Sequence, residues 1–260
     1  EIPLRLVGSE MCIRDRNKIT YLPDEKKTTV MDGHGGYMNG SRYYGEDLPI
    51  NTWYMKRFAG LSEDGLSLWY YTDKETNEEK TTTTYSTGDF YLCGDPNPDL
   101  YGGFGTSITF HGFDLSTQFS YLVGGLTYDY GYAGMMGNPT ATSVGNRWHK
   151  DVLKAWSPEN PSSTIPRWYF NDLNTTGSSD RFLIDGSYLN LQNIQVGYTL
   201  PDSWTSHLKI KNLRLYFVCD NVYYWSKRKG LDPRRSISGV GTSGKIAPFR
   251  TYSGGISLQF

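Results

Sequence analysis

Four histidines are the side chains of this sequence best suited to hold a metal, yet their spacing argues against a metal site. A zinc site draws at least two ligands from one short segment, as in HxH or HExxH, so that one strand or helix presents both. No such pair occurs, and the three cysteines are far apart and form no CxxC pair. We therefore predict no metal and no cofactor. The residues concerned are His34, His111, His149, His207, Cys12, Cys93 and Cys219.

Adjacent carboxylates are the next candidates for chemistry, because paired acids carry out glycoside hydrolysis. Neighbouring residues of a strand point to opposite faces, so adjacent pairs do not place two carboxylates across one bond. Gly102-Gly-Phe-Gly105 is rich in glycine, but it lacks the downstream helix that a phosphate-binding loop needs. Solvated loop charge is the simpler interpretation, and we predict no catalytic residue and no enzyme. The acidic pairs are Asp24-Glu25, Glu46-Asp47, Glu63-Asp64 and Glu78-Glu79.

Aromatic rings are the strongest candidates for ligand binding. Residues 125–187 form a connection with little periodicity that is rich in Gly, Asn, Pro, Ser and Trp. Aromatic rings stack on the apolar faces of sugars and also anchor apolar peptide side chains. The alternative is that these rings pack the connection against itself or against a neighbouring lipoprotein. The predicted substrate-binding residues are Tyr130, Trp148, Trp156, Trp168 and Tyr169.

The composition fits a chain of many short strands. Only 37% of the 260 residues are hydrophobic, the mean hydropathy is −0.54, and no apolar run approaches the 18 residues of a membrane helix. Transmembrane barrels escape that test, because each of their strands is apolar on one face only. Aromatic residues reach 15%, with 21 tyrosines and 29 glycines. The net charge of −1 gives no electrostatic reason to expect nucleic acid as a partner.

The end of the chain carries the clearest strand pattern. Side chains alternate between two faces of a strand, and the residues on one face here are apolar or glycine. The other face is small, polar and uncharged, which suits a wall that lines a wet lumen. The face that we expect to be apolar holds Tyr252, Gly254, Ile256, Leu258 and Phe260.

From residue 101 onward, strands alternate with short and long connections. A barrel with all its long loops on one side requires this alternation. A slip of one residue near Gln192-Asn193 breaks the period of one strand and indicates a bulge. We predict an all-β fold whose carboxy terminus lies on the side of the short turns. The expected strands are 104–110, 115–123, 188–200, 209–225 and 249–260, and the long connections are 125–187 and 227–248.

Before residue 100 the pattern is weaker. Residues 50–58 and 66–71 are interpreted as two strands of one hairpin, and 81–91 as a further strand. Residues 73–80 form a charged tip. Residues 1–16 match neither strand alternation nor the composition of the rest of the chain, so we interpret them as an adapter-derived or otherwise non-native leader. The remaining 17–260 form the folded part.

Several short segments, in order along the chain, resemble the SusC/RagA family, the TonB-dependent outer-membrane transporters of Bacteroidota. Their order over 17–260 gives the resemblance its specificity, although His111 stands where the family usually has Lys. The carboxy-terminal Phe260 also resembles the closing residue by which outer-membrane barrels are recognised for assembly. The segments are Asn17-Lys-Ile-Thr-Tyr-Leu-Pro23, Phe58-Ala-Gly-Leu-Ser-Glu-Asp-Gly65, Gly94-Asp-Pro-Asn-Pro-Asp-Leu100, His111-Gly-Phe-Asp-Leu115, Asp185-Gly-Ser-Tyr-Leu189, Gly197-Tyr-Thr-Leu-Pro201 and Gly230-Leu-Asp-Pro233.

This resemblance implies a fold and a function. Residues 17–260 would supply the carboxy-terminal portion, roughly 8–10 strands, of a transmembrane β-barrel that has 22 strands in the full family protein. Long loops would be extracellular, turns periplasmic, and the plug domain absent. The implied activity is TonB-dependent import of glycan fragments or oligopeptides across the Gram-negative outer membrane, with a periplasmic carboxy terminus. The implied partners are a SusD-like lipoprotein, the TonB complex through absent amino-terminal parts, the barrel-assembly machinery and outer-membrane lipids.

Two other functions stay open on the sequence alone. A surface carbohydrate-binding β protein that does not transport would use the same aromatic rings. A hydrolase embedded in a barrel would need a nucleophile or a metal constellation, and the sequence offers neither.

Overall fold

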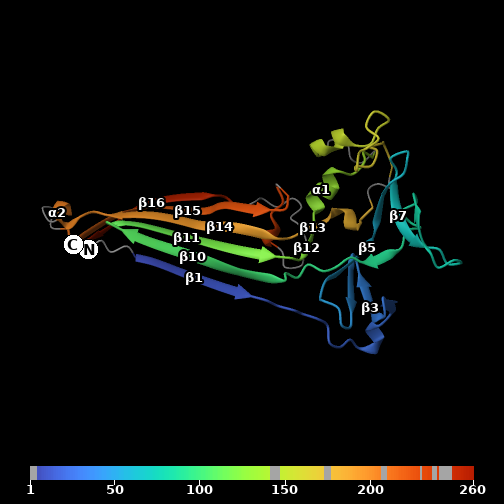
Figure 1. Cartoon of the computed structure of the whole chain (residues 1–260), viewed down its shortest axis with the longest axis horizontal. Helices are drawn as coiled ribbons and strands as arrows, with labels where there is room; N and C mark the ends of the chain where they lie inside the picture. The colour runs from blue at the N-terminus through green and yellow to red at the C-terminus, as the bar shows by residue number, and fades with distance from the viewer. Residues whose placement is uncertain are drawn as a thin grey trace.

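A long antiparallel sheet of six strands dominates the structure, in the order β1-β10-β11-β14-β15-β16 (Figure 1). It is a computed structural model that describes residues 5–140, 147–172, 177–205, 210–228, 230–235, 239 and 248–260. Each neighbouring pair runs antiparallel. The strands are β1 (Arg5–Ile13), β10 (Leu100–Phe110), β11 (Phe113–Val123), β14 (Tyr188–Thr199), β15 (Asn212–Ser226) and β16 (Thr251–Gln259).

The register of this sheet sorts its side chains onto two faces. Residues that pair across strands share a face, and Ile108, Leu115, Val196 and Phe217 pair in that sequence across four strands. They mark an apolar face, on which Leu115, Val196 and Phe217 stay largely exposed to solvent. The opposite face is polar. An exposed apolar face of this extent indicates contact with lipid or protein.

Turns and connections leave this sheet at opposite ends (Figure 1). His111 and Gly112, with φ of 48° and 82°, form the two-residue turn between β10 and β11. The short helix α2 (Asp202–Thr205) lies between β14 and β15. Both turns and the carboxy terminus lie at one end, whereas residues 124–187 and the residues after β15 leave from the other. The strands expected after residue 101 are therefore confirmed, with bounds shifted by a few residues.

The predicted bulge is confirmed. The register between β14 and β15 shifts between Leu191 and Asn193, and the partner strand β11 shifts at the same level. Asn221 on β15 has a φ of 51°, so the backbone of the partner strand is also distorted there. The bulge keeps apolar and polar residues on their own faces on both sides of this level.

Two smaller sheets and the first long connection, which contains the two-stranded sheet β12-β13, form a separate region, the head, at the end opposite the turns (Figure 1). The first small sheet has the order β2-β3-β4-β5-β9 and the second β6-β7-β8. The elements of the head are β2 (Thr29–Met31), β3 (His34–Asn39), β4 (Arg42–Gly45), β5 (Thr52–Lys56), β6 (Phe58–Leu61), β7 (Ser67–Thr72), β8 (Glu79–Thr82), β9 (Phe90–Leu92), β12 (Leu126–Tyr128), α1 (Tyr130–Met135), β13 (Leu183–Asp185) and the 3₁₀ turns η1 (Asp24–Lys26), η2 (Lys150–Lys154) and η4 (Asp180–Phe182). A further 3₁₀ turn, η6 (Pro233–Arg235), follows β15.

An aromatic core holds the head together. Trp53, Met55, Tyr128, Met136 and Phe182 are buried against one another. They come from β5, β12, the end of α1 and η4, so the core joins the first hundred residues to the connection that follows β11. Each fully buried side chain of this size stabilises the fold by about 1.5–3 kcal/mol.

Two expectations for the first hundred residues are corrected. The predicted hairpin of 50–58 with 66–71 is wrong in its pairing, because β7 pairs with β6 while β5 pairs with β4 and β9. The chain changes sheet at Arg57, and the next amide, Phe58 N–H, donates to the Asp180 carboxylate at 2.8 Å. The expected strand 81–91 is divided into β8 and β9 by a turn. These strands lie in the head, so the long sheet has six described strands where roughly 8–10 were expected.

β1 lies within the predicted leader, and it pairs with β10 from Arg5 opposite Thr109 to Ile13 opposite Tyr101. Glu10 lies opposite Phe104, on the face that is apolar elsewhere in the sheet. The pairing occupies the edge of β10, and the non-native origin of residues 1–16 stays a prediction. Among the described residues, no helix is both long enough and apolar enough to cross a membrane.

Cys93 in the head is expected to resist alkylation. Burial raises the pKa of its thiol to about 11. At pH 8 only about one such thiol in 1000 is ionised, and the thiolate is the reactive form, so its reaction with iodoacetamide should be at least about 100-fold slower than that of free cysteine. Mass spectrometry of timed samples measures this rate. The same protein unfolded in urea is the control, and equal rates in the folded and unfolded states would contradict the burial.

Candidate functional site

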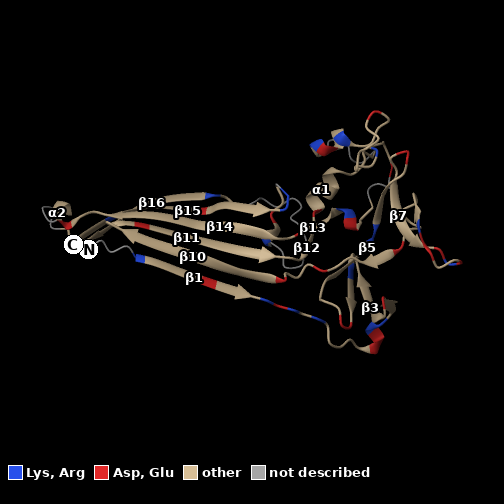
Figure 2. Ribbon diagram, in the orientation of Figure 1, with Lys and Arg blue, Asp and Glu red and all other residues tan. Residues whose placement is uncertain are grey.

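The polar face of β11, β14 and β15, here called the polar wall, gathers the ionised groups of the five strands of the long sheet that follow β1. β10, β11, β14, β15 and β16 contain three charged residues, Asp114, Arg214 and Asp220. The register places all three on the polar face, because Asp114 pairs with Gly197, Gly197 with Tyr216, and Arg214 and Asp220 share the phase of Tyr216. Figure 2 shows few charged residues along this sheet and many more in the head.

Arg214 and Asp114 form an ion pair across the intervening strand. Arg214 Nε and Nη2 donate to the two carboxylate oxygens of Asp114 at 3.0 and 2.5 Å. Gly197 of β14 lies between them, and a Cβ built there would be 2.4 Å from Asp114 Oδ1. The space that Gly197 leaves open lets the guanidinium reach the next strand but one. The bidentate geometry holds both side chains flat against the wall.

Further along the wall, two side-chain amides form hydrogen bonds between neighbouring strands. Asn193 Nδ2 donates to Asp220 Oδ1 at 2.7 Å at the level of the bulge. Asn190, which is buried, donates to Ser120 Oγ at 3.4 Å. The wall is thus a row of hydrogen-bonding groups that continues to the head end of the sheet.

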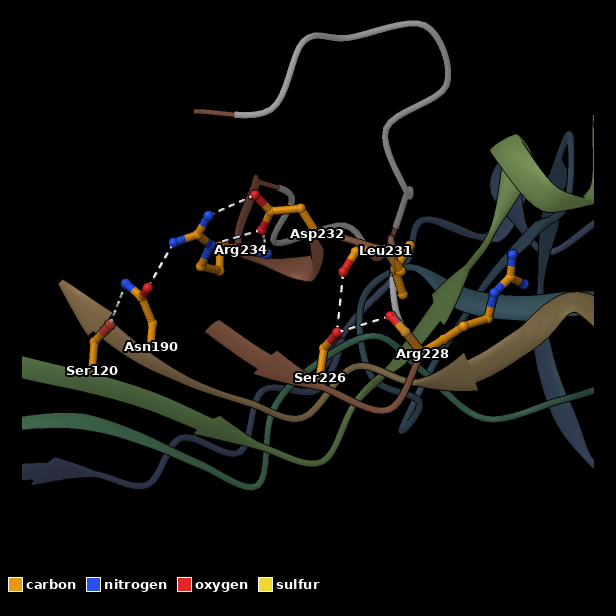
Figure 3. A network of polar contacts seen from close by, with 7 residues as sticks. All are labelled: Ser120, Asn190, Ser226, Arg228, Leu231, Asp232 and Arg234. Atoms are coloured by element: carbon orange, nitrogen blue, oxygen red, sulfur yellow. Dashed lines mark hydrogen bonds and ion pairs between the residues drawn. The ribbon is translucent and has the colours of Figure 1, made fainter. Parts of the chain in front are cut away.

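At that end the residues after β15 fold back onto the wall (Figure 3). Arg234 of η6 donates from Nη1 to Asn190 Oδ1 at 2.7 Å. Its other nitrogens donate to both oxygens of Asp232 at 2.8 Å, and the guanidinium lies 4.5 Å from the Tyr224 ring centre. Asp232 and Asn190 are buried by this arrangement. The network fixes η6 over the polar side of β14 and β15.

A second set of contacts ties the same segment to the head. Ser226 Oγ donates toward the carbonyl oxygens of Arg228 and Leu231, each at 3.1 Å (Figure 3). The Arg228 guanidinium lies 3.5 Å from the Tyr132 ring centre and forms an ion pair with Asp129 at 2.9 Å. We call the described residues 226–235 the strap, because they connect the rim of the wall to α1. Burial raises the pKa of the Tyr132 hydroxyl, so this ring stays neutral beside Arg228 at physiological pH.

Two more arginines pack against aromatic rings of the head. Arg42 lies 3.1 Å from the Trp53 ring centre, and Arg181 lies 5.3 and 5.1 Å from the rings of Phe58 and Phe182. Burial lowers the pKa of each guanidinium to about 10. Both therefore remain cationic at neutral pH, where stacking on aromatic rings stabilises a desolvated cation.

The sequence-predicted aromatic residues separate into packed and exposed rings. Trp148 and Trp168 pack edge to face at 5.4 Å, and both donate an indole N–H to the Gly137 carbonyl oxygen, at 3.1 and 3.2 Å. The Trp156 ring covers Gly65, where a Cβ would be 2.3 Å from it. The tryptophans thus fix the shape of the first long connection.

Tyr130 and Tyr169 are the exposed members of the predicted set. Tyr130 is 37% exposed and contacts Tyr128, with ring centres 4.4 Å apart. Tyr169 is 60% exposed, and the Arg167 guanidinium lies 4.9 Å from its ring. Phe260 is 74% exposed, just past the end of β16. The structure brings Trp148 and Trp168 together and leaves the other three predicted aromatic side chains at separate places in the head.

Sequence reasoning missed the residues of the strap network. It identified 227–248 as a long connection, and it had no signal that Arg234 would reach Asn190, 44 positions earlier. The amides, hydroxyls and charges of the wall and the strap described above are bonded to one another. Among the residues that the structure describes, no three His, Cys, Asp or Glu side chains gather as a metal site.

Comparison with known proteins finds TonB-dependent receptors. A scan against protein-family models found no match. The chain is 28% identical to the TonB-dependent receptor P3 of Formosa agariphila over 277 residues, which covers 95% of this chain and 26% of the relative. It is 27% identical to the TonB-dependent receptor SusC of Bacteroides thetaiotaomicron over 180 residues, covering 68% of this chain and 17% of that receptor. The chain is homologous to SusC/RagA-type TonB-dependent receptors.

Solved SusC/RagA-type structures agree in fold. The RagAB peptide transporter matches with a TM-score of 0.79 at 23% identity, covering 99% of this chain and 27% of that chain. The RagAB importer in its closed-closed state matches equally well at 24% identity. The chain spans about a quarter of the length of the first receptor and the importer. The chain corresponds to the barrel part of these receptors. TonB-dependent receptors of this type are transporters and not enzymes.

Proposed function

We propose that this chain is the carboxy-terminal barrel part of an outer-membrane TonB-dependent importer of oligopeptides or glycan fragments. The observation that carries the proposal is the segregation of charge: five strands hold three charged residues, all on the polar wall. In a soluble β-sandwich the apolar face of each sheet is buried against the other sheet, so it would not be exposed as it is here. A barrel wall has a reason to expose it, because one face meets lipid and the other a wet lumen.

The orientation follows from the same proposal. The head and the strap lie on the extracellular side, and the turns at His111-Gly112 and α2 lie in the periplasm with the carboxy terminus. Phe260, exposed beyond β16, serves as the signal to the barrel-assembly machinery. A SusD-like lipoprotein covers the head, and the TonB complex acts through parts of the receptor outside this chain.

Substrate contact is proposed for the predicted aromatic residues in the head. Tyr130 and Tyr169 offer exposed rings to sugars or apolar peptide side chains. Trp148, Trp156 and Trp168 hold the connection that carries them. The related RagAB complex is named a peptide transporter, which supports oligopeptides as the first substrates to test.

Uptake by cells tests this function. In a strain that makes the complete receptor, the variant with both Tyr130→Ala and Tyr169→Ala should take up fluorescent oligopeptides or oligosaccharides several-fold more slowly than the wild type. Tyr21→Ala is the matched control, because Tyr21 is 71% exposed elsewhere in the head. A heat-dependent shift in gel mobility reports the folded barrel. Receptor found outside the outer-membrane fraction, or deletion of its gene without loss of uptake of any oligomer, contradicts the proposal.

A further inference from the structure

Two hollows lie next to each other at the head end of the long sheet, and Trp225 and Ser226 line both of them. The first has a volume of about 430 Å³, and its apolar lining includes Tyr121, Leu189 and Trp225. The second has a volume of about 650 Å³ and is lined by Tyr223, Trp225, Arg250 and Tyr252 among others. The register places Tyr121, Leu189 and Trp225 opposite one another on three neighbouring strands, all on the apolar face. The first hollow therefore lies on the apolar face, and the second shares Trp225 and Ser226 with it while also reaching Gly230 and Arg234 of the strap.

Arg250 gives the second hollow a cationic side. It precedes β16, is exposed, and contacts the Tyr252 hydroxyl at 3.4 Å. No described carboxylate lines this hollow. The other guanidinium in the lining, that of Arg234, is already neutralised by Asp232 on the polar side of the sheet. A net positive charge next to three aromatic rings remains on the apolar side.

We propose that these two hollows bind one anionic lipid, whose phosphate lies on Arg250 and whose acyl chains lie along Tyr121, Leu189 and Trp225. The inference rests on the proposed function, since the apolar face meets lipid only in a membrane barrel. An apolar hollow joined to a cationic one matches an amphiphile with an acidic head. Aromatic rings and arginines lie at the headgroup level of membrane proteins for the same reason.

A water-soluble ligand fits this location less well. Oligopeptides and oligosaccharides enter the lumen, where the polar wall offers amides and hydroxyls, whereas Arg250 and Trp225 lie on the other face. The guanidinium of Arg250, with apolar surface beside it, is complementary to a ligand that has one anionic group next to apolar chains. A lipid with a phosphate headgroup is such a ligand. One arginine at a lipid surface changes affinity for an anionic lipid about fivefold.

Native mass spectrometry of the complete receptor tests the site. The receptor is released from nanodiscs of phosphatidylcholine that contain about one-fifth phosphatidylglycerol, and the bound lipids are counted. The wild type should retain phosphatidylglycerol in preference to phosphatidylcholine. Arg250→Gln should reduce that preference about fivefold, and Trp225→Ala should reduce retention of both lipids. Lys74→Gln, which removes one exposed cation at the tip between β7 and β8, should leave both unchanged.

Three results would overturn the proposal. They are an unchanged phosphatidylglycerol preference in Arg250→Gln, displacement of the lipid by inorganic phosphate at equal concentration, and tighter binding of an acidic oligopeptide that depends on Arg250. The mobility shift and uptake assay are run on the same preparations. A folded, transporting receptor without lipid preference refutes this site alone, whereas a receptor that neither forms a barrel nor transports refutes the proposed function.

Discussion

Replacing Lys56 with methionine is expected to unfold the turn between β8 and β9 and to lower the free energy of its local opening by about 3 kcal/mol. The Lys56 side chain is buried, with 4% of the residue exposed. Its ammonium donates to the carbonyl oxygens of Tyr85, Ser86 and Gly88 at 2.6, 3.2 and 2.5 Å. Methionine has a similar length and no donor, so it would leave three carbonyl groups without their partner. Each buried carbonyl left unpaired costs about 1–3 kcal/mol, less where water enters.

Hydrogen exchange of the backbone amides in residues 84–92 measures this effect. The Asp89 amide, which donates to the Tyr70 carbonyl at 2.9 Å, should lose most of its protection. Lys74→Met is the matched control, because Lys74 is exposed on the neighbouring turn. Unchanged exchange in Lys56→Met would mean that the turn holds its shape without the ammonium.

Local patterns explain why the long sheet could be predicted from the sequence. The hairpin of β10 and β11 follows from matched alternation on both sides of His111-Gly112, and the bulge follows from one break in period near Gln192. Each signal lies within about 20 residues of chain. Because successive side chains of a strand point to opposite faces, the sequence pattern directly predicts which residues share a face. The apolar and polar faces of β16 were readable for the same reason.

Contacts between distant segments explain what could not be predicted. Phe58 bonds Asp180 across 122 positions, and this contact helps to place β6 in a sheet apart from β5. Arg234 reaches Asn190 by a fold of the strap that no periodicity encodes. The sequence shows that the first long connection is rich in tryptophan, but it does not show which rings are packed and which are exposed. The structure shows this, because Trp156 packs on Gly65 and Trp148 packs on Trp168.

Arg214→Ala is expected to destabilise the barrel by about 2 kcal/mol, because it leaves the Asp114 carboxylate without its bidentate partner. Both side chains are about one-quarter exposed, 28% for Arg214 and 26% for Asp114, so water compensates part of the loss. Gly197→Val should have a similar effect by another route, since the new side chain would occupy the space between the two charges. Urea titration of the complete receptor in lipid vesicles, followed by tryptophan fluorescence, measures both changes.

A charge exchange separates the ion pair from general damage to the wall. In the variant Asp114→Arg with Arg214→Asp the pair can form again in the opposite sense, because Gly197 still leaves the path between the strands open. We expect this double variant to regain at least half of the stability lost in Arg214→Ala, and Asp114→Arg alone to be the least stable, since it places two cations side by side. Asp114 and Arg214 are 100 positions apart in the sequence. If the double variant lost as much stability as the two single variants together, the ion pair would contribute nothing, and backbone pairing alone would hold these strands together.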